Sequence, residues 1–215
     1  MSTTVPDPAD PFDPFDPEIL HLPAGSEFYR VHGSRFGPTR FNPGQGVGGR
    51  FHFFGDPPVP VLCLADTREA AVAETLLHDL PVGVPSRLGP DAYLDAVLSM
   101  VRITRDLEVA MFHGLGLRRL GVRATELTNT PARHYPRTRP WAQATHGVGL
   151  DGAVWMSRQV NSDRALVVFG DRVAEDDLEV VAGEGMVFAS APGFAWLVQM
   201  CAPLQIDVAP WNPRP

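Results

Sequence analysis

A series of short apolar runs limits the fold of this chain more than any other feature. The runs are rich in valine, leucine, isoleucine and alanine, and they occupy residues 59–64, 95–104, 107–112, 153–156 and 165–169. Runs of this length between polar turns are typical of β-strands. Their irregular spacing, with few helical segments between them, predicts a single α+β domain with a mixed, strongly bent sheet.

The first of these runs leads into a predicted helix. Asp66 has the character of an N-cap, and Glu69 follows three residues later, which is a capping-box arrangement for a helix over residues 68–79. On such a helix Ala70, Glu74 and His78 share one face at four-residue spacing. Glu74 is therefore expected in mid-helix beside small alanines.

Two further segments are less regular. Residues 133–147 predict a short helix entered through Pro140 at its first turn. Residues 194–201, with sequence FAWLVQMC, fit a packed strand or a helix equally well, so both alternatives stay open.

The length of 215 residues favours one domain. Residues 1–26 form a Pro- and Asp-rich leader whose repeated prolines favour an extended or disordered segment. The folded domain is expected to span residues 27–215. It opens with a short apolar entry at 28–31, followed by a loop rich in Gly, Pro and Arg that is long enough to bind a ligand.

Charge and cysteine content limit the partners. A net charge of −7 provides no basic surface for nucleic acid and no polybasic run for a membrane. The chain has two cysteines and no signal-peptide pattern at its start, so we expect a cytoplasmic protein in a reducing compartment. The apolar stretch at 194–204 is too short to cross a bilayer.

The basic residues are all arginines, because the 18 positions counted as Lys or Arg contain no lysine. This excludes every mechanism that needs a lysine ammonium, including the phosphate-loop lysine and the Schiff-base lysine. An anionic substrate must be held by arginine, whose planar guanidinium suits two-point contact with phosphate.

Three tempting motifs lack support. Gly44, Gly46 and Gly49 match the pattern G-x-G-x-x-G, but no strand precedes them and no helix follows. Cys63 lies inside an apolar run, where a small buried sulfur is the common interpretation. The histidines and cysteines show no paired spacing typical of zinc, so no metal is expected.

Several stretches together resemble one known family. F-Y-R-V-H, R-F-N-P, G-G-R-F-H, V-P-V-L-C-L-A-D-T and A-V-A-E-T-L-L-H-D resemble, in order and spacing, the N-terminal half of RES domains, and L-D-G-A-V-W-M-S-R followed by A-L-V-V-F resembles their C-terminal serine motif. The resemblance covers roughly residues 27–172. It implies a fold similar to ADP-ribosyltransferase toxins, NAD cleavage by phosphorolysis or hydrolysis, and a role as the toxin beside a helix-turn-helix antitoxin.

The resemblance also implies the site residues. The Arg, Glu and Ser of the family's name correspond here to Arg50, Glu74 and Ser157, and Arg30 matches a further basic position. Many members carry Tyr where this chain has Cys63, which puts the reaction rate in doubt. Under this hypothesis Arg30 and Arg50 hold the phosphates of NAD, and Glu74 faces the cationic ribose.

Ser157 is expected to orient the ribose or the attacking phosphate or water, and three aromatic residues are candidates to stack on the rings of NAD: Tyr29, Phe51 and Trp155. Each residue also has a structural interpretation. The arginines could be solvated or paired, Glu74 could be an exposed helix residue beside His78, Ser157 could cap a turn, and the aromatics could be core residues.

Two other functions stay open. The same site could transfer ADP-ribose to a macromolecule, or the chain could bind NAD or a partner without catalysis. NAD is expected as substrate rather than cofactor, with inorganic phosphate as a candidate co-substrate. The sequence leaves open phosphate against water as nucleophile, the presence of an antitoxin, and assembly into a homo-oligomer.

Overall fold

A computed structural model describes residues 5–8 and 14–211 of the chain. The main feature is a strongly curved, mixed sheet of nine strands within these residues, in the order β1-β6-β7-β8-β3-β2-β5-β10, with β9 also pairing with β5. The pairs are antiparallel except for β6 with β7. The strands of this sheet are β1 (Ile19–Leu22), β2 (Glu27–Gly33), β3 (Val61–Ala65), β5 (Ala96–Ile103), β6 (Leu107–Phe112), β7 (Gly152–Met156), β8 (Arg164–Phe169), β9 (Leu178–Val180) and β10 (Met186–Val187).

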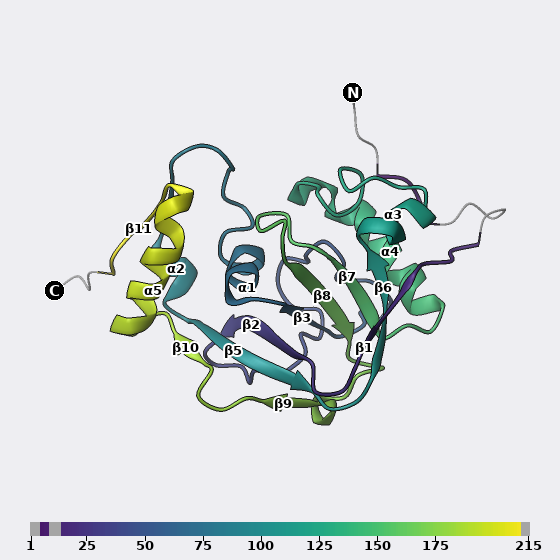
Figure 1. The fold of residues 1–215 in the computed structure, drawn as a ribbon, viewed down its shortest axis with the longest axis horizontal. Coiled ribbons are helices and arrows are strands. Elements are labelled where there is room, and N and C mark those ends of the chain that lie inside the picture. The colour runs from purple at the N-terminus through teal and green to yellow at the C-terminus, as the bar shows by residue number, and fades with distance from the viewer. Residues whose placement is uncertain (1–4, 9–13, 212–215) are drawn as a thin grey trace.

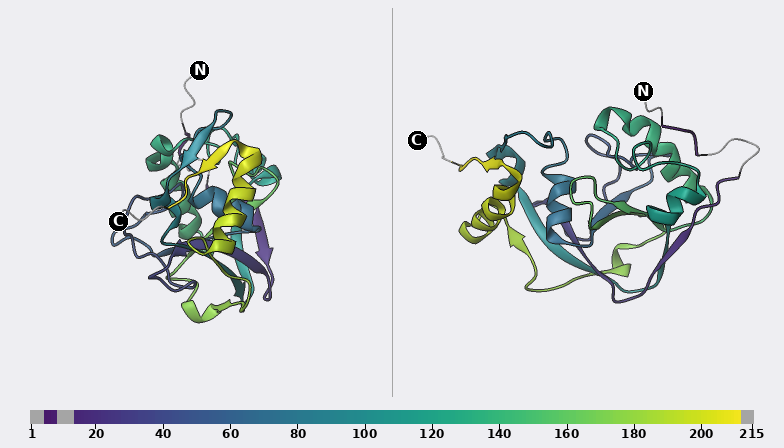
Figure 2. Two further views of the ribbon diagram at one scale, coloured as in Figure 1. Left: turned by 90° about the vertical axis from the view of Figure 1, so that its left-hand side faces the viewer. Right: turned by 45° about the horizontal axis from the view of Figure 1, so that its top comes forward.

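The helices gather at the two ends of the curved sheet, with one between them (Figure 1). Helices α2 and α5 lie at one end beside a small parallel pair of strands, while α3 and α4 lie at the other end and α1 lies between (Figures 1 and 2). These elements are α1 (Arg68–Thr75), α2 (Pro90–Tyr93), α3 (Gly114–Arg119), α4 (Tyr135–Gly147), α5 (Ala191–Cys201), the strands β4 (Ser86–Leu88) and β11 (Ile206–Val208), and three short 3-10 turns at Ala132–His134, Glu175–Asp177 and Ala202–Leu204. The predicted fold class, a single α+β domain with a mixed bent sheet and few helices, is confirmed.

Three clusters of buried apolar side chains hold these elements together. The first includes Phe112, Trp141 and Phe169, the second Phe28, Val101 and Val168, and the third Val72, Leu98 and Leu197. Strand β3 contributes to all three, because Val61 belongs to the first, Leu62 and Leu64 to the second and Ala65 to the third. The centre of the sheet therefore connects the packing of both ends.

The five predicted strands are present, and the undecided segment at 194–201 lies in helix α5. Two expected helix starts are wrong. Helix α1 is capped by Thr67, whose Oγ1 accepts a hydrogen bond from the Ala70 amide at 3.1 Å, because the Asp66 carboxylate is engaged with Arg164 at 2.7 Å. Helix α4 begins at Tyr135, so Pro140 lies inside it rather than in its first turn.

Helix α1 is also shorter than expected. It ends at Thr75, so His78 lies outside it and does not share a helical face with Glu74. The His78 ring contacts the Thr75 carbonyl at 3.0 Å and the Asp79 carboxylate at 3.0 Å. Glu74 therefore has no i+4 partner on α1 and faces a different set of groups.

Part of the predicted leader belongs to the sheet. Strand β1 pairs with β6 over four positions, and the Trp141 Nε1 donates to the Pro6 carbonyl at 2.9 Å. These contacts extend the folded body to the N-terminal side of residue 27. Residues 9–13 of the leader lie outside the described residues.

Candidate functional site

The site opens where the sheet divides. Strands β2 and β3 are neighbours in the sheet, yet a single register pair joins them, Tyr29 with Ala65. Beyond this pair the two strands diverge, and a cavity of about 810 Å³ is lined by both strands, by α1 and by the loop before β3. Side chains of both strands project into this open space, among them Arg30 and Cys63.

Glu74 is anchored at the wall of this cavity. Its Oε1 accepts a hydrogen bond from the Ser157 hydroxyl at 2.7 Å and another from the Arg158 amide at 3.0 Å. Within the described part of the chain, Oε2 accepts no hydrogen bond and is the oxygen left for a ligand. The interpretation of Glu74 as an exposed helix residue does not hold, because two groups more than 80 residues away fix its carboxylate.

Ser157 is fully buried and does not line the cavity. Its hydroxyl donates to Glu74 and accepts from the Val160 amide at 3.3 Å. The structure thus brings Glu74 and Ser157 together, but it places the serine behind the carboxylate. This position suits a residue that orients Glu74 rather than one that touches a ligand.

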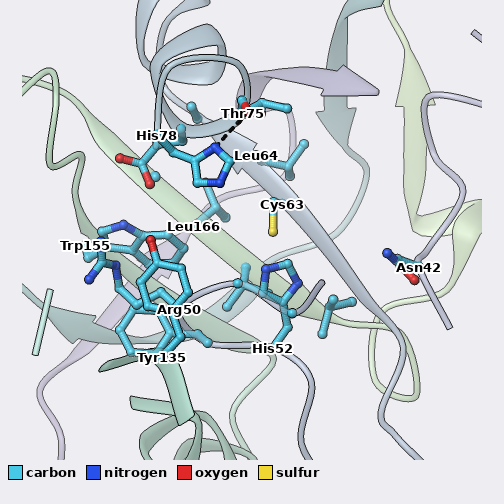
Figure 3. Close-up of a pocket in the computed structure, with 18 of the residues that line it drawn as sticks. Asn42, Arg50, His52, Cys63, Leu64, Thr75, His78, Tyr135, Trp155 and Leu166 are labelled. Carbon is cyan, nitrogen blue, oxygen red and sulfur yellow. Dashed lines mark hydrogen bonds between the residues drawn. The ribbon is translucent and has the colours of Figure 1, made fainter. Parts of the chain in front are cut away.

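Arg50 also lines the cavity and is buried. Its guanidinium donates to the Thr130 hydroxyl at 2.6 Å and the Thr130 carbonyl at 3.0 Å, and it lies 4.9 Å from the centre of the Tyr135 ring (Figure 3). Burial lowers the pKa of Arg50, and the neighbouring Tyr135 and Glu74 oppose that change. The hydrogen-bond partners of this buried guanidinium are uncharged, so its positive charge favours an anionic ligand in the cavity.

Arg30 and Cys63 come from the two diverging strands. Burial lowers the pKa of Arg30 to about 10, and its Nη1 donates to the Pro38 carbonyl at 2.5 Å. The Cys63 side chain is open to the cavity, so its expected burial in the core is wrong (Figure 3). Desolvation deep in the cavity raises the pKa of the Cys63 thiol to about 11, although Arg30 acts in the opposite direction.

The loop residue His52 also points into the cavity (Figure 3). Burial lowers the pKa of His52 to about 4, with a further lowering from Arg139, and its Nδ1 is buried without a hydrogen-bond partner among the described residues. The ring packs so closely on Gly49 that a Cβ atom there would collide with it. The Gly-Gly pair of the G-G-R-F-H motif is thus explained by close packing in the loop.

The three predicted aromatic residues occupy different environments. Tyr29 lines the cavity and is half-buried, with the Arg68 guanidinium 5.3 Å from its ring centre. Phe51 and Trp155 also line it, but they are 1% and 5% exposed and pack edge-on with their centres 4.9 Å apart. They form part of the first cluster at the cavity floor and offer little free ring surface for stacking.

Sequence reasoning missed several cavity residues, above all Tyr135 and His52. Burial raises the pKa of Tyr135, which keeps its hydroxyl protonated beside Arg50. The signal for His52 was present, because it closes the G-G-R-F-H motif. Tyr135 belongs to no motif, and it precedes Pro140, where the first turn of its helix was predicted.

The described residues contain neither a candidate metal site nor a candidate membrane span. No group of three or more His, Cys, Asp or Glu side chains there could hold a metal ion. None of the helices in that part of the chain is both long and apolar enough to cross a membrane.

Comparisons with known proteins identify a family and a shared fold. A family model described as RES domain matches residues 27–188, well over half of the chain. Among solved structures, a chain of the M. tuberculosis MbcT-MbcA toxin-antitoxin complex is similar with a TM-score of 0.58 and 17% identity, over 86% of this chain and 91% of that chain. At this identity the likeness shows a shared fold. No curated protein matches the sequence.

Proposed function

Because this chain belongs to the RES domain family, we propose that it degrades NAD by cleaving the nicotinamide–ribose bond and that it is the toxin of a toxin–antitoxin pair. The toxin role is supported by the shared fold with a chain of the MbcT-MbcA toxin-antitoxin complex. The expected partner is a helix-turn-helix antitoxin, and the expected location is the cytoplasm. NAD is the substrate, and the proposal requires no further cofactor.

The observation that carries the proposal is that an anchored carboxylate and two guanidiniums line one cavity. Glu74, Arg30 and Arg50 come from different elements and all line the same space. NAD combines a pyrophosphate with a ribose that becomes cationic as nicotinamide leaves. Two arginines and one carboxylate therefore match the charges of the substrate as bond cleavage develops.

Each group has a role in this scheme. The bond between nicotinamide nitrogen and ribose C1′ breaks, its electron pair returns to the nitrogen, and nicotinamide departs as a neutral molecule. The free Oε2 of Glu74 stabilises the positive ribose, as carboxylates do in glycoside cleavage. An oxygen of water or phosphate then bonds to C1′, giving ADP-ribose and a released proton, or ADP-ribose phosphate.

The test is incubation of the purified protein with NAD, with and without inorganic phosphate, followed by nicotinamide release and product mass. Glu74→Gln keeps the shape but removes the charge, and we expect it to lower the rate by about 100-fold or more. Ser157→Ala removes one of two anchors and should lower the rate by about tenfold, the worth of one hydrogen bond to a charged group.

Glu69→Gln is the matched control, because Glu69 lies on the exposed side of the same helix and does not line the cavity. It should leave the rate unchanged. Phosphate dependence would assign phosphorolysis, and cleavage without phosphate would assign hydrolysis. Persistence of NAD under both conditions, or full activity of Glu74→Gln, would overturn the proposal. Transfer of ADP-ribose to a macromolecule would instead appear as a mass increase on that acceptor.

A further inference from the structure

A second cavity adjoins the first at Arg30. Its volume is about 740 Å³, and it shares four lining residues with the first cavity: Arg30, Val31, Asn42 and Thr75. Glu74 lines the first cavity but not the second. A ligand that passes Arg30 could therefore place one end beside Glu74 and its other end in a separate compartment.

Arg30 at the junction lacks an anionic partner. It donates to the Pro38 carbonyl, and among the described residues no carboxylate lies within salt-bridge distance of its guanidinium. The residue is partly buried, so solvent compensates its charge incompletely. An anionic group of a ligand, such as a pyrophosphate, would supply the missing charge between the two cavities.

The second cavity also carries groups that suit a nucleoside. The Phe36 ring is 48% exposed, and the Arg35 guanidinium lies 5.4 Å from its centre, so an aromatic surface and a cation stand together where a base could stack. The Asp95 carboxylate is exposed in the same cavity, and no described residue donates a hydrogen bond to it. Carboxylates bind ribose hydroxyls in many nucleotide sites.

We propose that the second cavity binds the adenosine half of NAD, with the pyrophosphate on Arg30, the ribose on Asp95 and the adenine on Phe36. This inference rests on the proposed function, since it takes NAD as the substrate of the first cavity. It orients the dinucleotide so that the nicotinamide ribose is the part that reaches Glu74. It also assigns two residues, Phe36 and Asp95, that no motif had indicated.

The first measurement is the binding of ADP by calorimetry, because ADP carries adenosine and pyrophosphate but no bond to be cleaved. We expect the unmodified protein to bind ADP, and Phe36→Ala to weaken binding by about tenfold, as loss of one stacked base does elsewhere. Asp95→Asn should weaken it by a similar factor. Leu115→Ala is the control, since Leu115 is 74% exposed and lines neither cavity.

The second measurement compares NAD with nicotinamide mononucleotide, which lacks the adenosine half. Phe36→Ala should raise the KM for NAD and leave the kinetics of the mononucleotide unchanged. If neither compound is cleaved but ADP binding depends on Phe36 and Asp95, the proposed reaction fails while the adenosine site stands. No ADP binding, or equal effects of Phe36→Ala on both substrates, would overturn the inference.

Discussion

At the scale of single residues, the environment of a side chain decides what it can do. Ser157 and Glu74 were both expected to act on the substrate, but one is fully buried and the other lines the cavity. The difference arises because Ser157 follows β7 directly and packs behind α1, while Glu74 is near the end of α1 where the sheet divides. A sequence motif identifies both residues but does not show which of them lines the cavity.

His52 leads to a prediction about pH. Its pKa is about 4 in the folded chain and near 6.5 in the unfolded chain. As the pH falls from 6.5 to 4, His52 therefore binds a proton in the unfolded chain but not in the folded chain. The free energy of unfolding falls as a result. The full loss is of the order of 3 kcal/mol. In His52→Gln this contribution is absent, so its melting temperature should fall less steeply between pH 7 and pH 4.

The control for this experiment is His21→Gln, because the His21 side chain is 73% exposed and its contact with the Glu108 carboxylate at 3.3 Å lies in solvent, where such a pair adds little stability. That variant should follow the unmodified protein over the whole pH range. Equal slopes for His52→Gln and the unmodified protein would show that His52 is not buried as described.

At the scale of elements, the N-terminus of α1 gives a second prediction. Thr67 caps the helix and also donates to the Asp163 carboxylate at 3.1 Å. Thr67→Ala should therefore lower the free energy of unfolding by about 1–2 kcal/mol. Glu69→Ala should change it by less than about 0.5 kcal/mol, because Glu69 is exposed.

Chemical denaturation of the two variants separates this cap from the capping box that the sequence suggested. A larger loss for Glu69→Ala than for Thr67→Ala would favour the capping box and contradict the structure.

The elements also show where sequence reasoning succeeds. The strands were predictable because their apolar runs follow from local burial and need no knowledge of distant partners. The start of α1 was not, since Asp66 and Thr67 are both good caps and the choice depends on Arg164, 98 residues away. Cys63 was misplaced for the same reason, because the divergence of β2 from β3 leaves no trace in the local sequence.

At the scale of the whole molecule, the three clusters are expected to unfold together. Strand β3 contributes side chains to each of them, so one end of the sheet cannot lose its packing without exposing the centre. Trp141 belongs to the first cluster and Trp196 packs against the third. Tryptophan fluorescence and far-UV circular dichroism should therefore give one coincident transition in urea. Two separated transitions would show that the ends of the sheet are independent.

The single register pair between β2 and β3 has an evolutionary consequence. Because the Cys63 side chain is exposed at the cavity, it is not enclosed by close packing as core side chains are. Exchanges at such a position change the shape and chemistry of the binding space at little cost to folding. Residues that line the cavity can therefore change during evolution, and alter the ligand specificity, while the fold stays the same.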